Sequence, residues 1–429
     1  MEIKKKVAFK TLGCRLNQFE SGSLATKFKT AGYKLVNFDE DADVYIVNTC
    51  TVTNQSDHKS RNIISQASRR GKNPLVVVTG CMAESSKEWL LKDKNVSYVV
   101  GNDNKSDVFS VVDSHFKGEV FSLNENRNVF NFLNPQKIFK TRGTVKIQDG
   151  CDNYCTFCII PFVRGKAISR PMNDILSNIQ DLIEYGYREI VITGVNIGRY
   201  HFENNCFEDL IEKTLELPGD FRLRISSMEP EGIGSKFLSL IDHPKMSPHL
   251  HICLQSGSDK ILLKMRRMYD VQKYLSLIEK IKVRKELFNF TTDILVGFPG
   301  ETDQDFKDTL KVIHEVRFGH IHTFKYSLRD GTRASRMDDH ISDKIKNERS
   351  SVVRQLSEQY KIKYRQKLIG HTQKVLVEKQ RKDGFLIGYG ENYIPVKWEG
   401  EKNRIDFFEN VRLKEIDPLD HTVIAELEN

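Results

Sequence analysis

Three cysteines within eight residues constrain this chain more than any other feature of its sequence. Cys151, Cys155 and Cys158 are spaced C-x3-C-x2-C and directly follow a strand-like run at 145–148. A structural zinc site needs four protein ligands, usually from two distant C-x2-C pairs, and this loop has no local fourth Cys or His. Three thiolates on an iron–sulfur cubane leave one iron open to an exchangeable ligand. The spacing therefore favours such a cluster over a zinc loop or a chance grouping.

The composition is that of a soluble globular protein with two or three domains, since 39% of the 429 residues are hydrophobic and 29% are charged. The N-terminal stretch lacks the apolar core of a signal peptide, and no apolar run approaches a membrane span. We therefore expect a cytoplasmic protein, whose eight cysteines stay reduced and serve as ligands or core residues. A formal net charge of +8 is compatible with a polyanionic partner, but also with plain solubility.

Residues 3–116 alternate short apolar strands with helices, which predicts an α/β domain with a parallel, doubly wound sheet. Cys14, Cys50 and Cys81 each fall just past the end of one of these strands. Because ligands bind at the carboxyl edge of such sheets, we expect the three thiols to converge and to hold a second cluster. Each alone would more often be a small buried hydrophobe. A redox dithiol pair is the alternative, and it would leave the third thiol without a role.

Residues 58–72 carry cations and no carboxylate. A solvated helix face is the ordinary explanation, but a run without counter-charge beside a cofactor edge favours binding of a phosphate backbone. The candidate contacts are Lys59, Arg61, Arg69 and Arg70. Residues 117–143 are polar with scattered aromatics and are expected to be a connector.

The strand–helix alternation resumes at residue 144 and is repeated six times up to residue 340. Six units are too few for a closed eight-fold barrel, so we predict an open, partial (β/α)6 barrel with its chemistry at the carboxyl ends of the strands. Glycines at that rim would let the backbone approach a cofactor, and polar side chains would bind it. The predicted cofactor contacts are Phe157, Gly194, Asn196, Ser226, Glu229, Gln255, Val296 and Gly297. Cys206 and Cys253 are not expected to be ligands.

Cations also lie close to the cysteine loop and in a later turn of the same domain. They suit a nucleic acid or a carboxylate-bearing substrate. The predicted contacts are Arg164, Lys166, Arg266 and Arg267.

The remaining chain consists of a basic helical linker at 341–369 and a run of alternating strand patterns at 370–429. Short strands separated by Gly and Asn turns predict a small antiparallel β-barrel of the oligonucleotide-binding style. Lys382 and Phe385 are candidates for contacts with RNA bases.

Three dispersed cysteines, then C-x3-C-x2-C, then a small β-barrel: this order resembles the methylthiotransferase family of radical S-adenosylmethionine (SAM) enzymes over essentially the whole chain. The segments at 11–17, 48–53 and 150–161 are most similar to the MtaB type, which acts on N6-threonylcarbamoyladenosine next to the tRNA anticodon. Where the superfamily usually has Gly-Gly-Glu, this chain has Thr193-Gly-Val-Asn196.

The resemblance implies a flavodoxin-like domain binding one [4Fe-4S] cluster through Cys14, Cys50 and Cys81. It also implies a radical SAM core with a second [4Fe-4S] cluster on Cys151, Cys155 and Cys158, where SAM binds, and a C-terminal TRAM domain that binds RNA. The implied activity is addition of a methylthio group to C2 of the modified adenosine. The implied partners are a tRNA anticodon stem-loop and a reductant such as flavodoxin or ferredoxin, with no membrane involved.

Two alternatives stay open. The first keeps the enzyme class but changes the substrate to isopentenyladenosine in tRNA or to an aspartate of a ribosomal protein. The second is a non-catalytic iron–sulfur protein that binds RNA and senses redox state.

Overall fold

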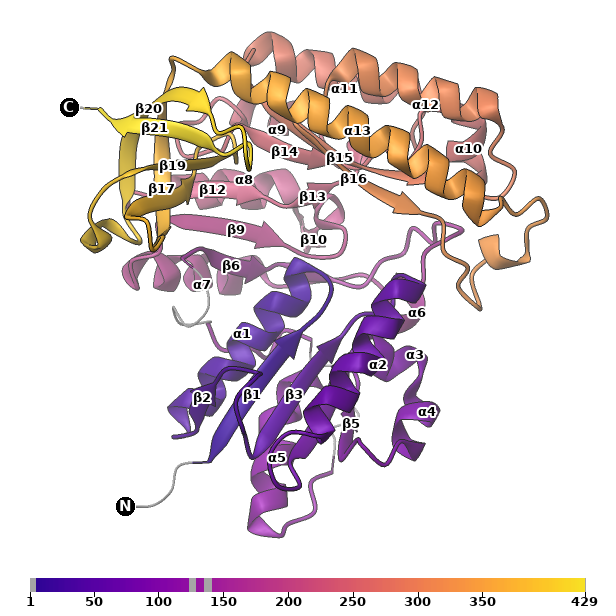
Figure 1. Ribbon diagram of the computed structural model, residues 1–429, viewed down its shortest axis with the longest axis vertical. Coiled ribbons are helices and arrows are strands. Elements are labelled where there is room, and N and C mark those ends of the chain that lie inside the picture. Colours follow the sequence, from indigo (N-terminus) through magenta and orange to yellow (C-terminus); the bar gives the residue numbers. More distant parts are fainter. Residues whose placement is uncertain (1–4, 123–128, 135–140, 429) are drawn as a thin grey trace.

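The structure is a computed structural model that describes residues 5–122, 129–134 and 141–428, so parts of the predicted connector lie outside the described residues. Figure 1 shows an N-terminal α/β unit, a larger strand-and-helix body packed against it, and a small β-barrel at one side of that body. None of the described helices combines the length and apolar character needed to cross a membrane.

The N-terminal unit is built on five parallel strands in the order β2-β1-β3-β4-β5. This is the flavodoxin-like order, so the predicted doubly wound sheet is confirmed. The strands are β1 (Lys6–Thr11), β2 (Lys34–Val36), β3 (Val44–Thr49), β4 (Leu75–Gly80) and β5 (Tyr98–Val100). The helices are α1 (Arg15–Thr30), α2 (Asn54–Ser68), α3 (Cys81–Ser85), α4 (Lys87–Lys92), η1 (Lys105–Asp107) and α5 (Val108–Lys117).

Six parallel strands of the central body follow each other in chain order, and each is succeeded by helical segments. They are β6 (Gly143–Lys146), β9 (Glu189–Thr193), β12 (Arg222–Ile225), β14 (His249–Ile252), β15 (Asn289–Val296) and β16 (His320–Lys325). The short strand β13 (Ser227–Met228) continues β12 and pairs with β14, which joins the two halves of the wall. This arrangement is the predicted partial (β/α)6 barrel.

The helices of the barrel pack around these strands and enclose one large apolar core. They are α6 (Ile160–Arg164), α7 (Met172–Glu184), η2 (Ile197–Arg199), α8 (Phe207–Glu216), η3 (Pro230–Gly232), α9 (Ser235–Leu240), α10 (Asp259–Lys264), α11 (Val271–Arg284), α12 (Asp303–Val316) and η4 (Ala334–Arg336). Two pairings of two-residue strands complete the body: β7 (Gln148–Asp149) with β8 (Ile168–Ser169), and β10 (His201–Phe202) with β11 (Asn205–Cys206).

A long helix, α13 (Asp343–Leu368), packs along β16 and leads into the C-terminal barrel. That barrel closes in the order β17-β18-β19-β21-β20 around a fully buried Trp398. Its elements are β17 (Thr372–Gln380), β18 (Phe385–Tyr389), β19 (Pro395–Glu399), η5 (Lys402–Arg404), β20 (Phe408–Ile416) and β21 (Val423–Leu427). The predicted barrel is confirmed with one correction, because β19 and β21 pair in parallel.

A buried ion network fixes the N-terminal unit to the central body. Glu20 of α1 pairs with Lys105 at 2.5 Å, with Lys146 of β6 at 2.9 Å and with Arg164 of α6 at 3.1 Å. Asp149 pairs with the same Arg164 at 3.0 Å. All five side chains are buried, so the hydrogen bonds that replace their water fix the relative position of the two units.

Candidate functional site

The loop that carries Cys151, Cys155 and Cys158 begins at the carboxyl end of the first barrel strands and is held from both sides. The backbone N–H of Cys151 donates to the Gly165 carbonyl at 3.1 Å. Thr156 donates through its backbone N–H to the Met265 carbonyl at 3.1 Å. These bonds fix the loop backbone, so the three thiols have defined positions.

Polar groups from the loops after β9 and α10 face these thiols. Nη1 of Arg267 lies 3.3 Å from Sγ of Cys155, and the same guanidinium pairs with Glu229. Nδ2 of Asn196 lies 4.0 Å from Sγ of Cys151. Desolvation raises the pKa of the Cys158 thiol to about 12, so a positively charged centre is required to hold it as a thiolate. Three thiols with a cation beside them are a donor set that fits a [4Fe-4S] cluster with one open iron.

The predicted cofactor contacts come from the carboxyl ends of four barrel strands and from the cysteine loop. Asn196 lies against that loop directly, and Glu229 lies against it through Arg267. Ser226 lines the cavity described below.

The other predicted cofactor contacts are held by backbone hydrogen bonds or by close packing inside the protein. At Gly194 a Cβ would lie 2.9 Å from the Gln148 carbonyl, so the chain passes too closely there for a side chain. Gln255 adopts a left-handed backbone with φ of 66° and bridges to β15. The Val296 carbonyl accepts from the Tyr326 N–H, and the Gly297 N–H donates to Glu301 at 2.6 Å. Phe157 packs edge-on against Phe298 with ring centroids 6.4 Å apart.

The three dispersed cysteines meet at the edge of the N-terminal sheet that faces the barrel. Cys14 follows β1 and Cys50 follows β3, so these two flank the point where the strand order reverses, and Cys81 opens α3 after the adjacent strand β4. Gly13 has φ of 93°, and a Cβ there would lie 2.9 Å from Cβ of Cys50. Gly80 has φ of 97°, and a Cβ there would lie 2.4 Å from the Thr49 carbonyl. Only glycine therefore lets these turns bring the thiols together.

Burial raises the pKa of the Cys81 thiol to about 11, against the attraction of Arg164 and Lys105. This thiol also needs a cationic centre if it is to be a thiolate. Cys50 is buried as well, whereas Cys14 is exposed at the edge. The donor set again fits an iron–sulfur cluster with one side open.

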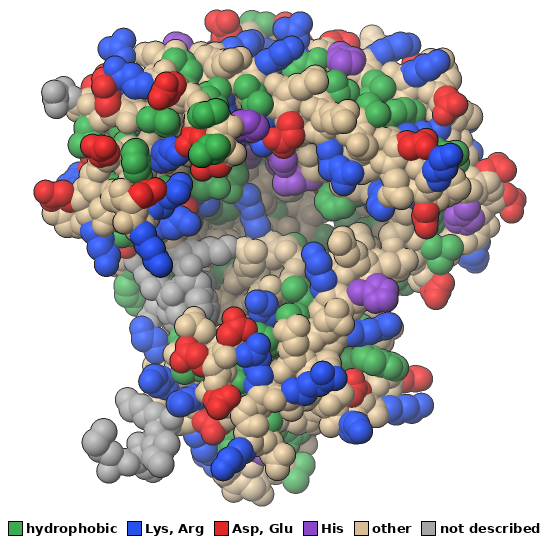
Figure 2. All heavy atoms as spheres, viewed as in Figure 1, with side chains coloured by type: hydrophobic (Ala, Val, Ile, Leu, Met, Phe, Trp, Pro, Cys, Tyr) green, Lys and Arg blue, Asp and Glu red, His purple; other side chains and the backbone are tan. Residues whose placement is uncertain are grey.

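A cavity of about 620 Å³ lies beside Cys14, between the N-terminal unit, the barrel, α13 and the C-terminal barrel. Figure 2 shows the surface hollowed between the two bodies, with His, Lys and Arg side chains around the hollow. The lining residues are Gly13, Cys14, Arg15, Gln18, Ile225, Ser226, Ser227, His249, His251, Asn289, Thr291, Asp293, Gly319, His320, His322, Phe324, Lys361, Arg365, Tyr389, Tyr393, Ile394 and Pro395.

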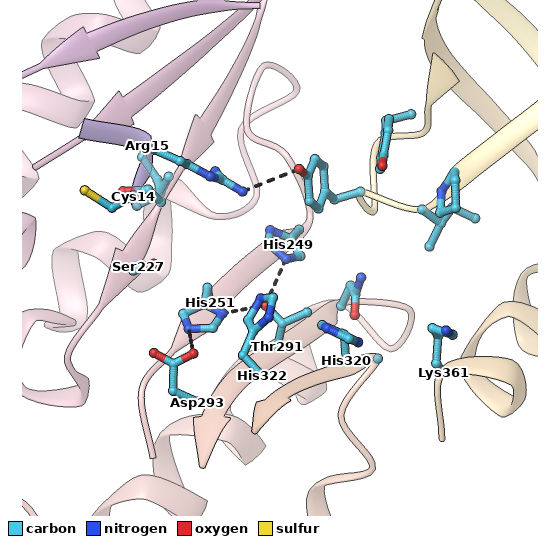
Figure 3. Close-up of a pocket in the computed structure, with 18 of the residues that line it drawn as sticks. Cys14, Arg15, Ser227, His249, His251, Thr291, Asp293, His320, His322 and Lys361 are labelled. Atoms are coloured by element: carbon cyan, nitrogen blue, oxygen red, sulfur yellow. Dashed lines mark hydrogen bonds and ion pairs between the residues drawn. The ribbon is translucent and has the colours of Figure 1, made fainter. Parts of the chain in front are cut away.

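A hydrogen-bonded row crosses the floor of this cavity (Figure 3). Nε2 of His249 and Nδ1 of His251 lie 3.2 and 3.0 Å from the Thr291 hydroxyl, and His251 also pairs with Asp293 at 3.2 Å. Burial lowers the pKa of His249 and brings that of His320 to about 4, so these two rings are neutral near pH 7. We did not predict this row. Its signal is the alternation of His with apolar residues at 249–251 and 320–322, which points both histidines of each strand to one face.

One wall of the cavity is made of stacked tyrosines and guanidinium groups. Tyr389 and Tyr393 stack with ring centroids 4.8 Å apart. The guanidinium of Arg224 lies 3.0 Å from the Tyr393 ring, and that of Arg142 lies 4.6 Å from the Tyr389 ring. These tyrosines therefore dock the C-terminal barrel onto the central body.

Two of the predicted RNA contacts are wrong. Arg164 is buried in the ion network with Glu20, and Arg267 is buried between Glu229 and Cys155. Their guanidinium groups bind three carboxylates and a thiol within the protein, so they do not face RNA.

The other predicted RNA contacts reach the surface to different degrees. Arg70 pairs with Asp39 at 2.9 Å, the Arg61 guanidinium lies 5.1 Å from the Trp89 ring, and half-buried Phe385 has the Lys397 ammonium 5.8 Å from its ring. The remaining cations have exposed side chains: Lys59, Arg69, Lys166, Arg266 and Lys382.

Comparison with known proteins agrees with this architecture. Residues 145–313 match the radical SAM superfamily, and residues 6–101 match a family described as "Uncharacterized protein family UPF0004". The solved structure of the radical SAM methyltransferase TsrM from Kitasatospora setae superposes with a TM-score of 0.59 at 13% identity, covering 78% of this chain and 77% of that one. The cobalamin-dependent SAM radical enzyme OxsB gives a TM-score of 0.52 at 12% identity, covering 83% of this chain and 56% of that one. Fold and cysteine loop thus define a radical SAM protein.

The curated relatives narrow this class. The "Threonylcarbamoyladenosine tRNA methylthiotransferase MtaB" of Thermotoga maritima is 36% identical, covering 96% of this chain and 95% of the relative. The protein of the same name from Bacillus subtilis is 35% identical, covering 95% of this chain and 93% of the relative. The "tRNA-2-methylthio-N(6)-dimethylallyladenosine synthase" of Endomicrobium trichonymphae is 34% identical, covering 94% of this chain and 96% of the relative. The chain belongs to the family of radical SAM tRNA methylthiotransferases, whose enzymes use SAM and a [4Fe-4S] cluster.

Proposed function

We propose that this protein adds a methylthio group to C2 of N6-threonylcarbamoyladenosine next to the anticodon of tRNA. The observation that carries the proposal is the cavity in which Cys14, the barrel floor and the C-terminal barrel meet. Full-length similarity at 35–36% identity to relatives named for this activity supports the substrate.

Two cysteine groups would hold the cofactors. Cys151, Cys155 and Cys158 would hold the [4Fe-4S] cluster to which SAM binds, and Cys14, Cys50 and Cys81 would hold a second one. When bound, SAM and the clusters supply the radical chemistry and the sulfur. Three of the predicted cofactor contacts lie at the cysteine loop or in the cavity wall. Asn196 and Glu229 lie at the loop, and Ser226 lines the cavity.

The chain's own contribution is to position the base and to keep water out. The cavity lies beside Cys14 on one side, while Ser226 and Ser227 approach from the carboxyl end of β12 and Asp293 from the middle of β15. An adenine placed there would have its reacting edge against Cys14. The tyrosine wall closes the cavity on the side of the C-terminal barrel and orients the base.

The polar lining favours the threonylcarbamoyl substrate over the alternative with a dimethylallyl group. His249, His251, Asn289 and Arg15 offer hydrogen bonds to a polar substituent. An apolar substituent would leave Nδ1 of His249 and Oδ1 of Asn289 unpaired, since both atoms are buried without a hydrogen-bond partner among the described residues, at a cost in binding.

The remaining partners follow from this substrate. The anticodon stem-loop would bind across the exposed cations near the cavity, and a reductant such as flavodoxin or ferredoxin would supply electrons. The protein would act in the cytoplasm, where tRNA is modified.

Nucleoside mass spectrometry tests the proposal. A strain that lacks the gene should contain N6-threonylcarbamoyladenosine without its methylthio derivative, while methylthiolation of isopentenyladenosine is unchanged. Complementation with the wild-type gene should restore the missing nucleoside. Loss of the isopentenyladenosine derivative instead, or loss of neither, would contradict the proposal.

A further inference from the structure

We propose that Arg15 binds the carboxylate of the substrate's threonylcarbamoyl group and thereby selects this nucleoside over neutral ones. The inference rests on the proposed function and names the residue that gives the cavity its substrate preference.

Arg15 lies at the reacting end of the cavity. It is the first residue of α1 and directly follows Cys14, so its backbone is fixed beside a predicted cluster ligand. Figure 3 shows its side chain reaching across the cavity, where Nη2 lies 3.4 Å from the Tyr393 hydroxyl. This is a weak bond at the upper limit of distance, so the guanidinium keeps donors for a ligand.

The charges of the lining single out this residue. Among the lining residues there are three cations and one carboxylate, Asp293, which is paired with His251. Lys361 pairs with Glu358, and Arg365 donates to the His421 carbonyl. In the described part of the chain no carboxylate lies within 4.0 Å of Arg15 or of Arg365, but the Arg365 side chain is buried at 8% exposure, so Arg15 is the lining cation beside Cys14 whose charge remains for a ligand.

The surroundings add to that positive potential. Around Tyr393 the guanidiniums of Arg224, Arg142 and Arg15 together lower the pKa of the phenol, although burial alone would raise it. An anionic ligand group entering here gains from the same field, in a cavity where the local dielectric is low.

The chemistry of the substrate points to the same place. In adenine, C2 and C6 flank N1, so the N6 substituent and the reacting carbon share one edge of the six-membered ring. A base that presents C2 toward Cys14 must also bring its N6 substituent to that side of the cavity. A planar guanidinium suits a carboxylate, because it can donate two parallel hydrogen bonds. The Arg15 side chain, next to Cys14, is thus in position to bind the carboxylate of the N6 substituent.

A binding experiment tests this without relying on turnover. Anaerobically reconstituted protein with SAM but no reductant is titrated with three anticodon stem-loops. One carries N6-threonylcarbamoyladenosine, one carries the same nucleoside with its carboxylate converted to the primary amide, and one carries unmodified adenosine. Fluorescence anisotropy gives the acid-to-amide affinity ratio, which is compared within each variant and is therefore independent of the active fraction.

Wild-type protein should prefer the acid over the amide by about 10- to 100-fold, the usual range for a hydrogen bond to a charged group. Arg15→Gln should bring this ratio close to one, and Arg15→Lys should keep part of it. Lys361→Gln, which removes a cation of the same cavity, should keep the wild-type ratio. Iron content and the cluster absorbance of each variant are measured in parallel.

An Arg15→Gln protein with the wild-type ratio would overturn the inference, as would a Lys361→Gln protein that loses it. Both results leave the proposed function intact if wild type still prefers threonylcarbamoyladenosine to adenosine. A wild-type protein that binds all three stem-loops equally would contradict the proposed function itself, and the inference with it.

Discussion

Arg164, which follows the C-x3-C-x2-C loop, reaches into the neighbouring unit and pairs with Glu20 of α1, with Nη1 3.1 Å from Oε1. Both side chains are almost completely buried. The two partners lie on elements that begin beside the two cysteine groups, so this contact fixes the position of one group relative to the other.

Glu20→Gln should destabilise the protein by about 3–5 kcal/mol, because it leaves Lys105, Lys146 and Arg164 buried with less counter-charge. Burial alone would raise the pKa of Glu20, but Arg164, Lys105 and Lys146 lower it well below the ordinary value, so the lost partner is a carboxylate. Urea unfolding measures the effect. The exposed Glu88→Gln is the matched control and should leave the transition unchanged. Equal midpoints for the two variants would show that the network does not hold the units together.

Arg267→Gln should lower the reduction potential of the cluster on the C-x3-C-x2-C loop. A cation 3.3 Å from Sγ of Cys155 stabilises the more negative, reduced state, and hydrogen bonds to cluster sulfurs tune potentials in this way. Redox titration followed by electron paramagnetic resonance measures the shift. Arg266→Gln changes the exposed neighbour and should leave the potential as in wild type. Equal reduction potentials in the two variants would show that Arg267 does not tune this cluster.

Glu189 should make the docking of the C-terminal barrel sensitive to acid. It pairs with Arg222 at 2.5 Å, and Arg222 in turn donates to the Lys374 and Tyr389 carbonyls of the barrel. Burial would raise the pKa of Glu189, but Arg222, Arg142 and Arg224 lower it to about 2 from an ordinary value of 4.5.

Because the folded-state pKa is depressed, this stabilisation is complete above pH 4.5 and is lost as the pH falls toward about 2. Glu189→Gln should therefore be less stable than wild type near neutral pH, by about 3–5 kcal/mol, and should lose less stability in that acidic range. Thermal unfolding as a function of pH measures both. Parallel pH profiles for variant and wild type would contradict the expected role.

Lys59 and Arg61 should contact RNA phosphates, since the start of α2 is anchored to the segment after β16, a strand whose Phe324 lines the cavity. The Asn54 N–H donates to the Ser327 hydroxyl at 3.1 Å, and Asp57 pairs with Arg329. Replacing both cations by alanine should weaken stem-loop binding similarly for all sequences and reduce the slope of log affinity against log salt by about 1 to 2. Arg70→Ala, whose side chain is paired with Asp39, should change the slope less. An unchanged slope in the double variant would mean a merely solvated helix face.

Much of the fold follows from local sequence patterns, and the exceptions have physical causes. β2 and β5 span three residues each, too few to show a period. The parallel pairing of β19 with β21 depends on chain topology, which alternation within one strand does not encode.

The cysteines of the site could be found because their positions are tied to strand ends, but the cations could not be assigned. Whether an arginine faces RNA or a buried carboxylate depends on side chains far away in the chain. Glu20 lies 144 positions from Arg164, and Glu189 and Arg222 are 33 apart. The cavity likewise exists only where four parts of the chain meet.

The most direct test of two cooperating cysteine groups is a single assay on the Cys14→Ser/Cys50→Ser/Cys81→Ser variant, with SAM cleavage and methylthiolated nucleoside measured together by mass spectrometry. Reconstituted wild-type protein should hold about twice the iron of this variant. The variant should still cleave SAM under reducing conditions but form no methylthio product on tRNA that carries N6-threonylcarbamoyladenosine. Methylthiolation by the variant at the wild-type level would contradict the account.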